Sequence, residues 1–178
     1  KIFLHNLQNL YRSFYFFRPK YKNEPLKKLL LEIFSPTLRL KDLPYRVVVP
    51  AFRLYSKDAK IWEPVFFNNF PSSKNADTLV VDAALASSAA PIYFPSYKRY
   101  IDGGVVSNNP DIVAISYAVS EHAAYAKLKD VVHLSFGTGW NPQKIKQKTK
   151  NWGLIQWMYS LRASDTTPKL PLFNVFTD

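Results

Sequence analysis

The sequence predicts an α/β fold, and three consecutive segments in its second half carry that prediction. Residues 92–104 contain apolar and aromatic residues that predict a short strand, and residues 110–129 have the composition of a helix. A continuous apolar run at 130–139 then ends in Gly-Thr-Gly, which is typical of a buried parallel strand. Strand, helix and strand in this order predict a βαβ unit. With 178 residues, 47% of them hydrophobic, the chain has the size and composition of one globular domain.

The N-terminal segment predicts two helices. In the first, apolar residues recur at spacings of four and three and form one stripe of a helix that ends before Pro19. The residues of this stripe are Phe3, Leu7, Leu10, Phe14 and Phe17. The second helix is predicted over 25–34, where Pro25 suits the first turn. Its apolar side consists of Leu26, Leu29, Leu30 and Ile33.

A strand pair and a short helix follow. The segments 45–56 and 61–69 are rich in β-branched and aromatic residues, and we expect the two strands to pair. Pro50 and Pro64 predict edge or bulge positions, because proline cannot donate to a ladder of hydrogen bonds. The segment 78–91 then predicts a helix from its alanine and leucine content, stopped by the proline at its end.

The helix predicted over 110–129 has clear start signals. Pro110 suits its first turn, and Asp111 lies where the helix dipole favours an acidic residue. Asn108 and Asn109 immediately before it are expected to brace its N-terminus.

The tail over 141–178 combines a basic run with tryptophans. Its lysines occupy every second position, at Lys144, Lys146, Lys148 and Lys150. After them, one predicted helical face consists of Trp152, Ile155, Met158 and Tyr159. Such a face packs on the domain or lies at a membrane interface, and the sequence leaves both open.

The net charge of +11 is concentrated at the N-terminal side. Residues 1–60 contain 13 Lys and Arg against 4 Asp and Glu, whereas the remaining residues contain 11 against 9. This bias favours an anionic partner, either nucleic acid or an anionic membrane surface, or it marks a solvated face. The motifs below explain more of the chain than a nucleic-acid site does, so no nucleic acid is expected as a partner.

Several kinds of site and segment are not predicted. There are no cysteines, and the three histidines show no metal-ligand spacing, so we expect no metal and no organic cofactor. No apolar run reaches the roughly 18 residues of a membrane-spanning helix, which favours a cytoplasmic or peripheral membrane location. The chain begins with Lys rather than Met, so we expect natural residues before it.

The most informative stretch is YIDGGVVSNNP over 100–110, where two of the five glycines follow one carboxylate. Asp-Gly between β-forming residues is the common signal for a type I′ hairpin turn at Asp102 and Gly103. Alternatively, the turn presents Asp102 as a general base. A carboxylate with the ordinary pKa of about 4 is a weak base, so this second interpretation requires partial burial of Asp102.

Three stretches in this order decide between them. ASSAAPIYFP over 86–95, IDGGVVSNNP over 101–110 and LSFGTG over 134–139 together resemble the patatin-like phospholipase family. The departures are mild, with Ser87 where threonine is frequent and Phe136 where leucine is usual. The resemblance extends over residues 1 to about 140 and implies a three-layer α/β fold with a mainly parallel central sheet.

The resemblance also implies the chemistry. Family members are serine hydrolases that cleave lipid acyl esters, of the phospholipase A or lysophospholipase type, with a Ser-Asp dyad. Asp102 matches the dyad aspartate, which would take the proton of the serine. Gly103 and Gly104 would shape the turn that presents it. Ser87, Ser88 and Pro91 match a segment near the active site that does no chemistry, and the implied partners are a phospholipid or other lipid ester and a peripheral membrane surface.

The other half of the family pattern is not in this chain. None of the five glycines, at 103, 104, 137, 139 and 153, brackets a serine as Gly-x-Ser-x-Gly requires, and there is no Gly-rich oxyanion loop. Both are expected before residue 1, so the fold is expected to be incomplete at its N-terminal side and the chain alone inactive. An alternative is a catalytically degenerate patatin-like module for binding or regulation.

Residues 1–178 are therefore expected to form the C-terminal portion of one patatin-like domain. The sequence divides it into basic helices and a strand pair over 1–70, the catalytic-Asp region and βαβ unit over 71–140, and the basic, Trp-bearing tail over 141–178.

Overall fold

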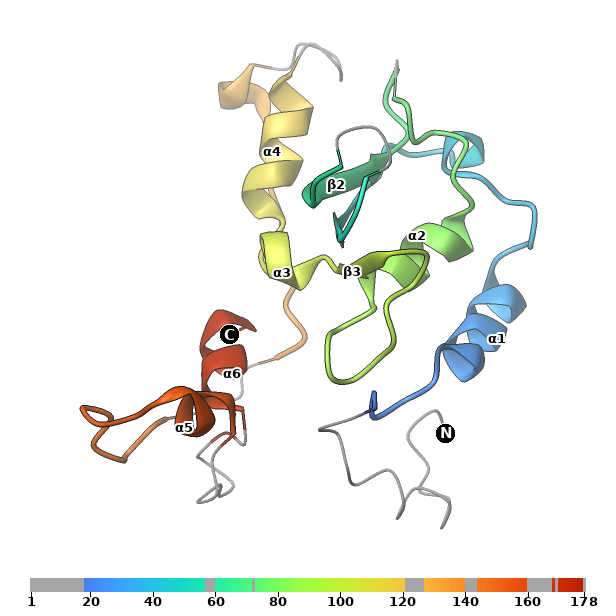
Figure 1. Cartoon of the computed structure of the whole chain (residues 1–178). Helices are drawn as coiled ribbons and strands as arrows, with labels where there is room; N and C mark the ends of the chain where they lie inside the picture. The colour runs from blue at the N-terminus through green and yellow to red at the C-terminus, as the bar shows by residue number, and fades with distance from the viewer. Residues whose placement is uncertain are drawn as a thin grey trace. The chain divides into compact units, whose positions relative to one another are not determined.

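The computed structural model describes residues 18–56, 60–71, 73–120, 127–139, 144–159, 168 and 170–177 (Figure 1). The chain divides into two compact units, a first unit over Lys1–Val131 and a second unit over Val132–Asp178. The apolar stripe of the first predicted helix lies outside the described residues.

The first unit is built on a three-stranded antiparallel sheet. Strand β1 (Val48–Arg53) lies between β2 (Glu63–Asn68) and β3 (Tyr100–Asp102). The pairing of β1 with β2 confirms the predicted strand pair, and β3 confirms the short strand expected within 92–104. At the centre of the sheet, fully buried Ala51 lies opposite Val65 on one side and Asp102 on the other.

The central place of β1 corrects the expectation for Pro50, which lies in a middle strand rather than at an edge. The ladder between β1 and β3 begins at Ala51, one residue later. Pro50 therefore lies just past the end of this ladder, where its missing N–H removes no bond to β3. Pro64 lies in β2, an edge strand of the described sheet, as predicted.

Helix α2 (Val80–Ser87) closes the core against β1. Small side chains at Ala83 and Ala86, both 1% exposed, let the helix approach the sheet closely. The core consists of Leu40, Ala51, Val65, Phe67, Val80, Ala83 and Ala86. Helix α1 (Asn23–Ile33) lies beside α2, and a short 3-10 helix η2 (Leu40–Asp42) contributes Leu40. Both predicted helices, over 25–34 and 78–91, are confirmed.

Helix α4 (Asp111–Val119) lies against the opposite face of β2. Successive residues of a strand face opposite sides, so Phe66 points away from the core that contains Val65 and Phe67. Its ring packs on Tyr117 of α4, with 6.4 Å between ring centroids. The first unit is therefore a mixed α/β structure with helices on both sides of the sheet (Figure 1).

The strand predicted over 130–139 is wrong. Residues 131–139 form neither helix nor strand, and the side chains of Val132 and Phe136 are 90% and 88% exposed. A parallel strand is stable when strands on both sides satisfy its backbone and helices cover its faces. No strand that the structure describes pairs with this run, so the expected βαβ unit is not formed and the described sheet is antiparallel. The predicted helix before it is formed over Asp111–Val119, and a 3-10 helix η3 covers Leu128–Asp130.

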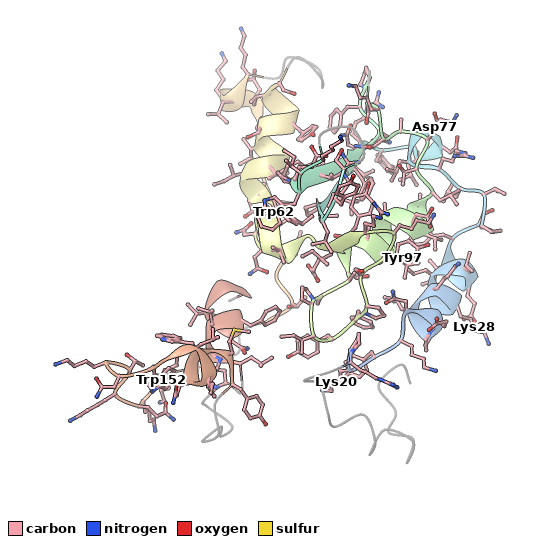
Figure 2. All side chains as sticks on the ribbon, viewed as in Figure 1. Lys20, Lys28, Trp62, Asp77, Tyr97 and Trp152 are labelled. Carbon is pink, nitrogen blue, oxygen red and sulfur yellow. The ribbon has the colours of Figure 1, made fainter. Side chains whose placement is uncertain are left out.

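The second unit contains two short helices, α5 (Leu154–Met158) and α6 (Pro171–Thr177), which contact one another. Trp152, which is labelled in Figure 2, precedes α5. Its ring packs edge-on against Trp157, with 5.1 Å between ring centroids. Leu154 and Ile155 are more than two-thirds exposed. Among the helices that the structure describes, none combines the length and the apolar character needed to span a bilayer.

Candidate active site

A tight turn delivers the chain to β3. The backbone groups of Tyr97 and Tyr100 exchange two hydrogen bonds, of 2.9 and 2.8 Å. Between them, Lys98 and Arg99 have φ angles of 48° and 69°. Two positive φ angles inside a doubly hydrogen-bonded pair are the features of a type I′ hairpin turn, here without the usual asparagine or glycine.

The Asp-Gly sequence itself makes no such turn. Gly103 has φ −65° and ψ −24°, in the right-handed helical region, and the chain continues directly into α3 (Gly104–Ser107). The hairpin interpretation of Asp102 and Gly103 is therefore wrong, and Asp102 is the last residue of β3 before a strand-to-helix connection.

The end of α2 holds the backbone around Asp102. The Asp102 N–H donates to the Ala89 carbonyl and the Gly103 N–H to the Ser87 carbonyl, both at 3.1 Å. The Ser88 hydroxyl is engaged elsewhere, because it donates to the Ala84 carbonyl at 2.7 Å within α2. Pro91 follows in the turn after α2. The structure thus brings the backbone of the Ser-Ser-Ala segment beside Asp102, without bringing the Ser88 hydroxyl to its carboxylate.

The Asp102 carboxylate is half-buried. Its Oδ1 accepts the Gly104 N–H at 2.6 Å. Burial raises the pKa of Asp102 above 3.8, and the hydrogen bond from Gly104 opposes this only in part. A carboxylate with a raised pKa takes a proton more readily than an exposed one. The partial burial that the general-base interpretation requires is therefore present.

The two glycines make room for different neighbours. A Cβ atom on Gly103 would lie 2.2 Å from the Pro50 carbonyl oxygen, so this glycine lets β1 approach the connection. A Cβ atom on Gly104 would lie 3.1 Å from Asp102 Oδ1 and 3.3 Å from Asn108 Oδ1. Gly104 is therefore the one that keeps space beside the carboxylate. Farther along, Asn109 Oδ1 accepts the Asp111 N–H at 3.0 Å, which is the bracing expected at the start of α4.

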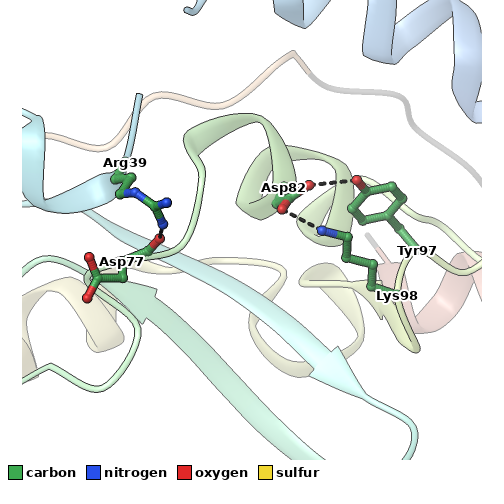
Figure 3. A network of polar contacts seen from close by, with 5 residues as sticks. All are labelled: Arg39, Asp77, Asp82, Tyr97 and Lys98. Carbon is green, nitrogen blue, oxygen red and sulfur yellow. Dashed lines mark hydrogen bonds and ion pairs between the residues drawn. The ribbon is translucent and has the colours of Figure 1, made fainter. Parts of the chain in front are cut away.

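The sequence analysis missed a polar network that joins α2 to the hairpin before β3 (Figure 3). The Tyr97 hydroxyl donates to Asp82 Oδ1 and Lys98 Nζ to Asp82 Oδ2, each at 2.6 Å. Burial opposes ionisation of Asp82, but the bonds from Lys98 and Tyr97 outweigh it and lower its pKa. Burial and the Asp82 carboxylate together raise the pKa of Tyr97 to about 12. No sequence pattern signals this network, because it joins the first turn of α2 to a hairpin 15 residues away.

A separate groove of about 690 Å³ lies along β2, lined by residues that include Arg53, Phe66, Lys74 and Tyr117. Its lining includes no residue of 87–91 or 102–104, so it is not part of the Asp102 site. Across the described parts of the chain, no three His, Cys, Asp or Glu side chains come together as a metal site would require.

Replacing Asp102 by Asn is expected to raise the free energy of unfolding at neutral pH relative to that of the wild type. When the pKa of a carboxyl is higher in the folded than in the unfolded chain, the protein loses stability as the pH rises from 3.8 through the folded-state pKa. Asn carries no charge, retains an oxygen for the Gly104 N–H and avoids this loss. Urea unfolding at about pH 3 and about pH 7 should therefore show a difference between variant and wild type that grows with pH. An equal difference at both pH values would contradict the raised pKa.

Comparisons with known proteins agree on one family. The family model described as patatin-like phospholipase matches residues 2–115. CotR of Bacillus subtilis is 40% identical over 128 residues, covering 72% of this chain and 39% of that protein. Protein teg of Priestia megaterium is 34% identical over 167 residues, covering 85% and 52%. The cGAMP-activated phospholipase of Vibrio cholerae is 33% identical over 132 residues, covering 67% and 36%. The chain thus spans about half or less of the length of these relatives.

Proposed function

Because this chain belongs to the patatin-like phospholipase family, we propose that the natural protein is a lipid acyl hydrolase in which Asp102 is the general base of a Ser-Asp dyad. The observation that carries the proposal is the half-buried Asp102 carboxylate with its raised pKa, held at the end of β3 by backbone bonds to the end of α2. Gly104 keeps space beside it.

The reaction begins when Asp102 takes the hydroxyl proton of a serine and the serine oxygen attacks the ester carbonyl carbon. When the resulting tetrahedral intermediate collapses, the ester C–O bond breaks, and the departing alcohol receives the proton from Asp102. A water molecule then gives its proton to Asp102 and attacks the acyl-serine, and the serine oxygen leaves with that proton. Each half-reaction returns Asp102 to its ionised form.

The serine and the oxyanion donors must come from outside this chain. The chain contains no Gly-x-Ser-x-Gly segment, and it spans only part of its relatives. A general base without its nucleophile retains little of the rate, so the 178 residues alone are proposed to be inactive. The name of the Vibrio relative, a phospholipase, favours a phospholipid substrate. We propose hydrolysis of the phospholipase A or lysophospholipase type.

The test of this proposal is release of fatty acid from mixed phospholipid vesicles by the natural polypeptide that carries this chain. We expect release by that polypeptide and none by residues 1–178 alone. No release from any lipid would instead favour the alternative, a catalytically degenerate module that keeps the fold for binding or regulation.

The second unit supports action at a membrane surface. Residues 132–178 contain six Lys and Arg against two Asp and Glu, and four of the lysines lie between 144 and 150. Close to them, α5 exposes Leu154, Ile155 and Met158. Lysines attract anionic lipid headgroups, and exposed apolar side chains enter the acyl boundary. We therefore propose a peripheral membrane location.

Replacing Lys144, Lys146, Lys148 and Lys150 together by Gln is expected to weaken binding to anionic vesicles by up to roughly 10³-fold, since each lysine near such a surface contributes about 1 kcal/mol and each 1.4 kcal/mol is a factor of ten. Sedimentation with phosphatidylserine-containing vesicles would measure the change. The matched control replaces four lysines of the first unit, Lys22, Lys28, Lys74 and Lys127, and is expected to change binding less. Equal losses in both variants would contradict a specific role for the second unit.

A further inference from the structure

We propose that Asp82 is a positioning residue for Asp102: through Tyr97 and Lys98 it fixes the hairpin that sets where β3, and so the Asp102 carboxylate, lies. This inference rests on the proposed function of Asp102. Asp82 itself would touch neither substrate nor reacting atoms.

The first step is the binding of the hairpin to α2. Each carboxylate oxygen of Asp82 accepts one hydrogen bond at 2.6 Å, from the Tyr97 hydroxyl and from Lys98 Nζ. The Asp82 side chain is only 19% exposed, so the ion pair is partly shielded from water and salt. Tyr97 also packs on the hydrophobic core, which orients its hydroxyl.

The second step is the conformational cost of the turn. Lys98 and Arg99 both lie in the left-handed region, where a residue with a Cβ atom is less stable by about 1–2 kcal/mol. A turn of this kind without glycine or asparagine persists when the surroundings hold it. The bonds from Asp82 to Tyr97 and Lys98, the first two residues of this turn, contribute that restraint on the α2 side.

The third step connects the turn to the reacting group. Tyr100 closes the turn and begins β3, so only Ile101 separates it from Asp102. At the far end of the same helix, the Ser87 and Ala89 carbonyls accept the N–H groups of Gly103 and Asp102. Helix α2 therefore contacts the chain at both ends of β3, in addition to the ladder that pairs β3 with β1. Losing the Asp82 bonds leaves the turn before β3 held from the β1 side, where the Leu54 N–H donates to the Arg99 carbonyl at 2.8 Å, without its contact to α2.

The activity experiment compares Asp82→Asn and Tyr97→Phe in the natural polypeptide, with kcat and KM for fatty-acid release normalised to folded protein. We expect kcat to fall by about 10- to 100-fold with KM little changed, because a displacement of about 1 Å in a reacting group has effects of that size. Tyr97→Phe keeps the ring in the core and removes a single hydrogen bond, so it remains informative if Asp82→Asn folds poorly. An unchanged kcat in folded protein would overturn the proposal.

Asp77→Asn is the matched control (Figure 3). This substitution removes the same charge as Asp82→Asn. In the wild type, Asp77 forms a 2.6 Å ion pair with Lys41, and this ion pair does not involve the hairpin. The Asp77 side chain is 72% exposed. We expect Asp77→Asn to leave kcat unchanged, and a loss equal to that of Asp82→Asn would overturn the proposal.

Hydrogen exchange separates failure of this inference from failure of the proposed function. In Asp82→Asn, the amides of Asp102 and Gly103 should exchange faster than in wild type, while in Asp77→Asn they should not. This measurement does not need an active enzyme. If the wild type releases no fatty acid but exchange is faster, the dyad is wrong and Asp82 still positions Asp102. If exchange at these amides is unchanged, positioning through the backbone is wrong whatever the activity.

Discussion

Replacing Asp102 by Asn in the natural polypeptide is expected to lower fatty-acid release from phospholipid vesicles by about 10²- to 10⁴-fold, the contribution of a positioned general base. The amide cannot accept the serine proton. It nevertheless has nearly the same shape as the carboxylate, and its oxygen can accept the Gly104 N–H that Asp102 Oδ1 accepts at 2.6 Å. The variant should therefore lose kcat while it remains folded.

The control for this experiment is Asp111→Asn, which removes a carboxylate from the first turn of α4 in the same unit. We expect it to retain activity close to that of the wild type. Two results together would support the dyad: Asp102→Asn no longer hydrolyses the lipid, and at neutral pH it is at least as stable as the wild type. The second is expected because Asn removes a partly buried charge. Wild-type rates in a folded Asp102→Asn protein would show that Asp102 is not the base.

Replacing Gly103 by Ala is expected to destabilise the first unit by about 3 kcal/mol or more, at the upper end of overpacking effects. Its backbone angles suit alanine, so the cost is steric and not conformational. The added Cβ would lie 2.2 Å from the Pro50 carbonyl oxygen and 2.7 Å from its carbon, both backbone atoms of the central strand. Neither can move without displacing the ladder of β1.

Urea unfolding of Gly103→Ala, Gly104→Ala and Gly137→Ala would test this. Gly104→Ala should be intermediate, because the nearest atoms to its Cβ belong to the Asp102 and Asn108 side chains, at 3.1 and 3.3 Å. Gly137 is the control, since nothing lies within 4 Å of a Cβ built there. Equal midpoints for Gly103→Ala and Gly137→Ala would contradict the close packing of the connection on β1.

Local patterns were sufficient for most elements of the first unit. Helices α1 and α2, the start of α4 and the β1–β2 pair lie where spacing, composition and proline positions predict them. Each depends mainly on residues within one segment, or on two strands joined by a short connection. The acidic residue followed by two glycines drew attention to Asp102 from the sequence itself, but its role as a general base came from the resemblance of three motifs to the family and stays a proposal.

The tertiary structure alone decided the features that depend on distant segments. The apolar run at 131–139 has the composition of a strand, but composition supplies no neighbouring strand, and the run forms none. Pro50 is central because β3 pairs with the far side of β1. Position 103 requires a glycine because the Pro50 carbonyl lies where a Cβ atom would be, and not because a turn requires one. The bond between Asp82 and Tyr97 likewise exists only once α2 and the hairpin pack on a shared core. Propensity acts between near neighbours in the chain, whereas close approach and burial arise between segments that only folding brings together.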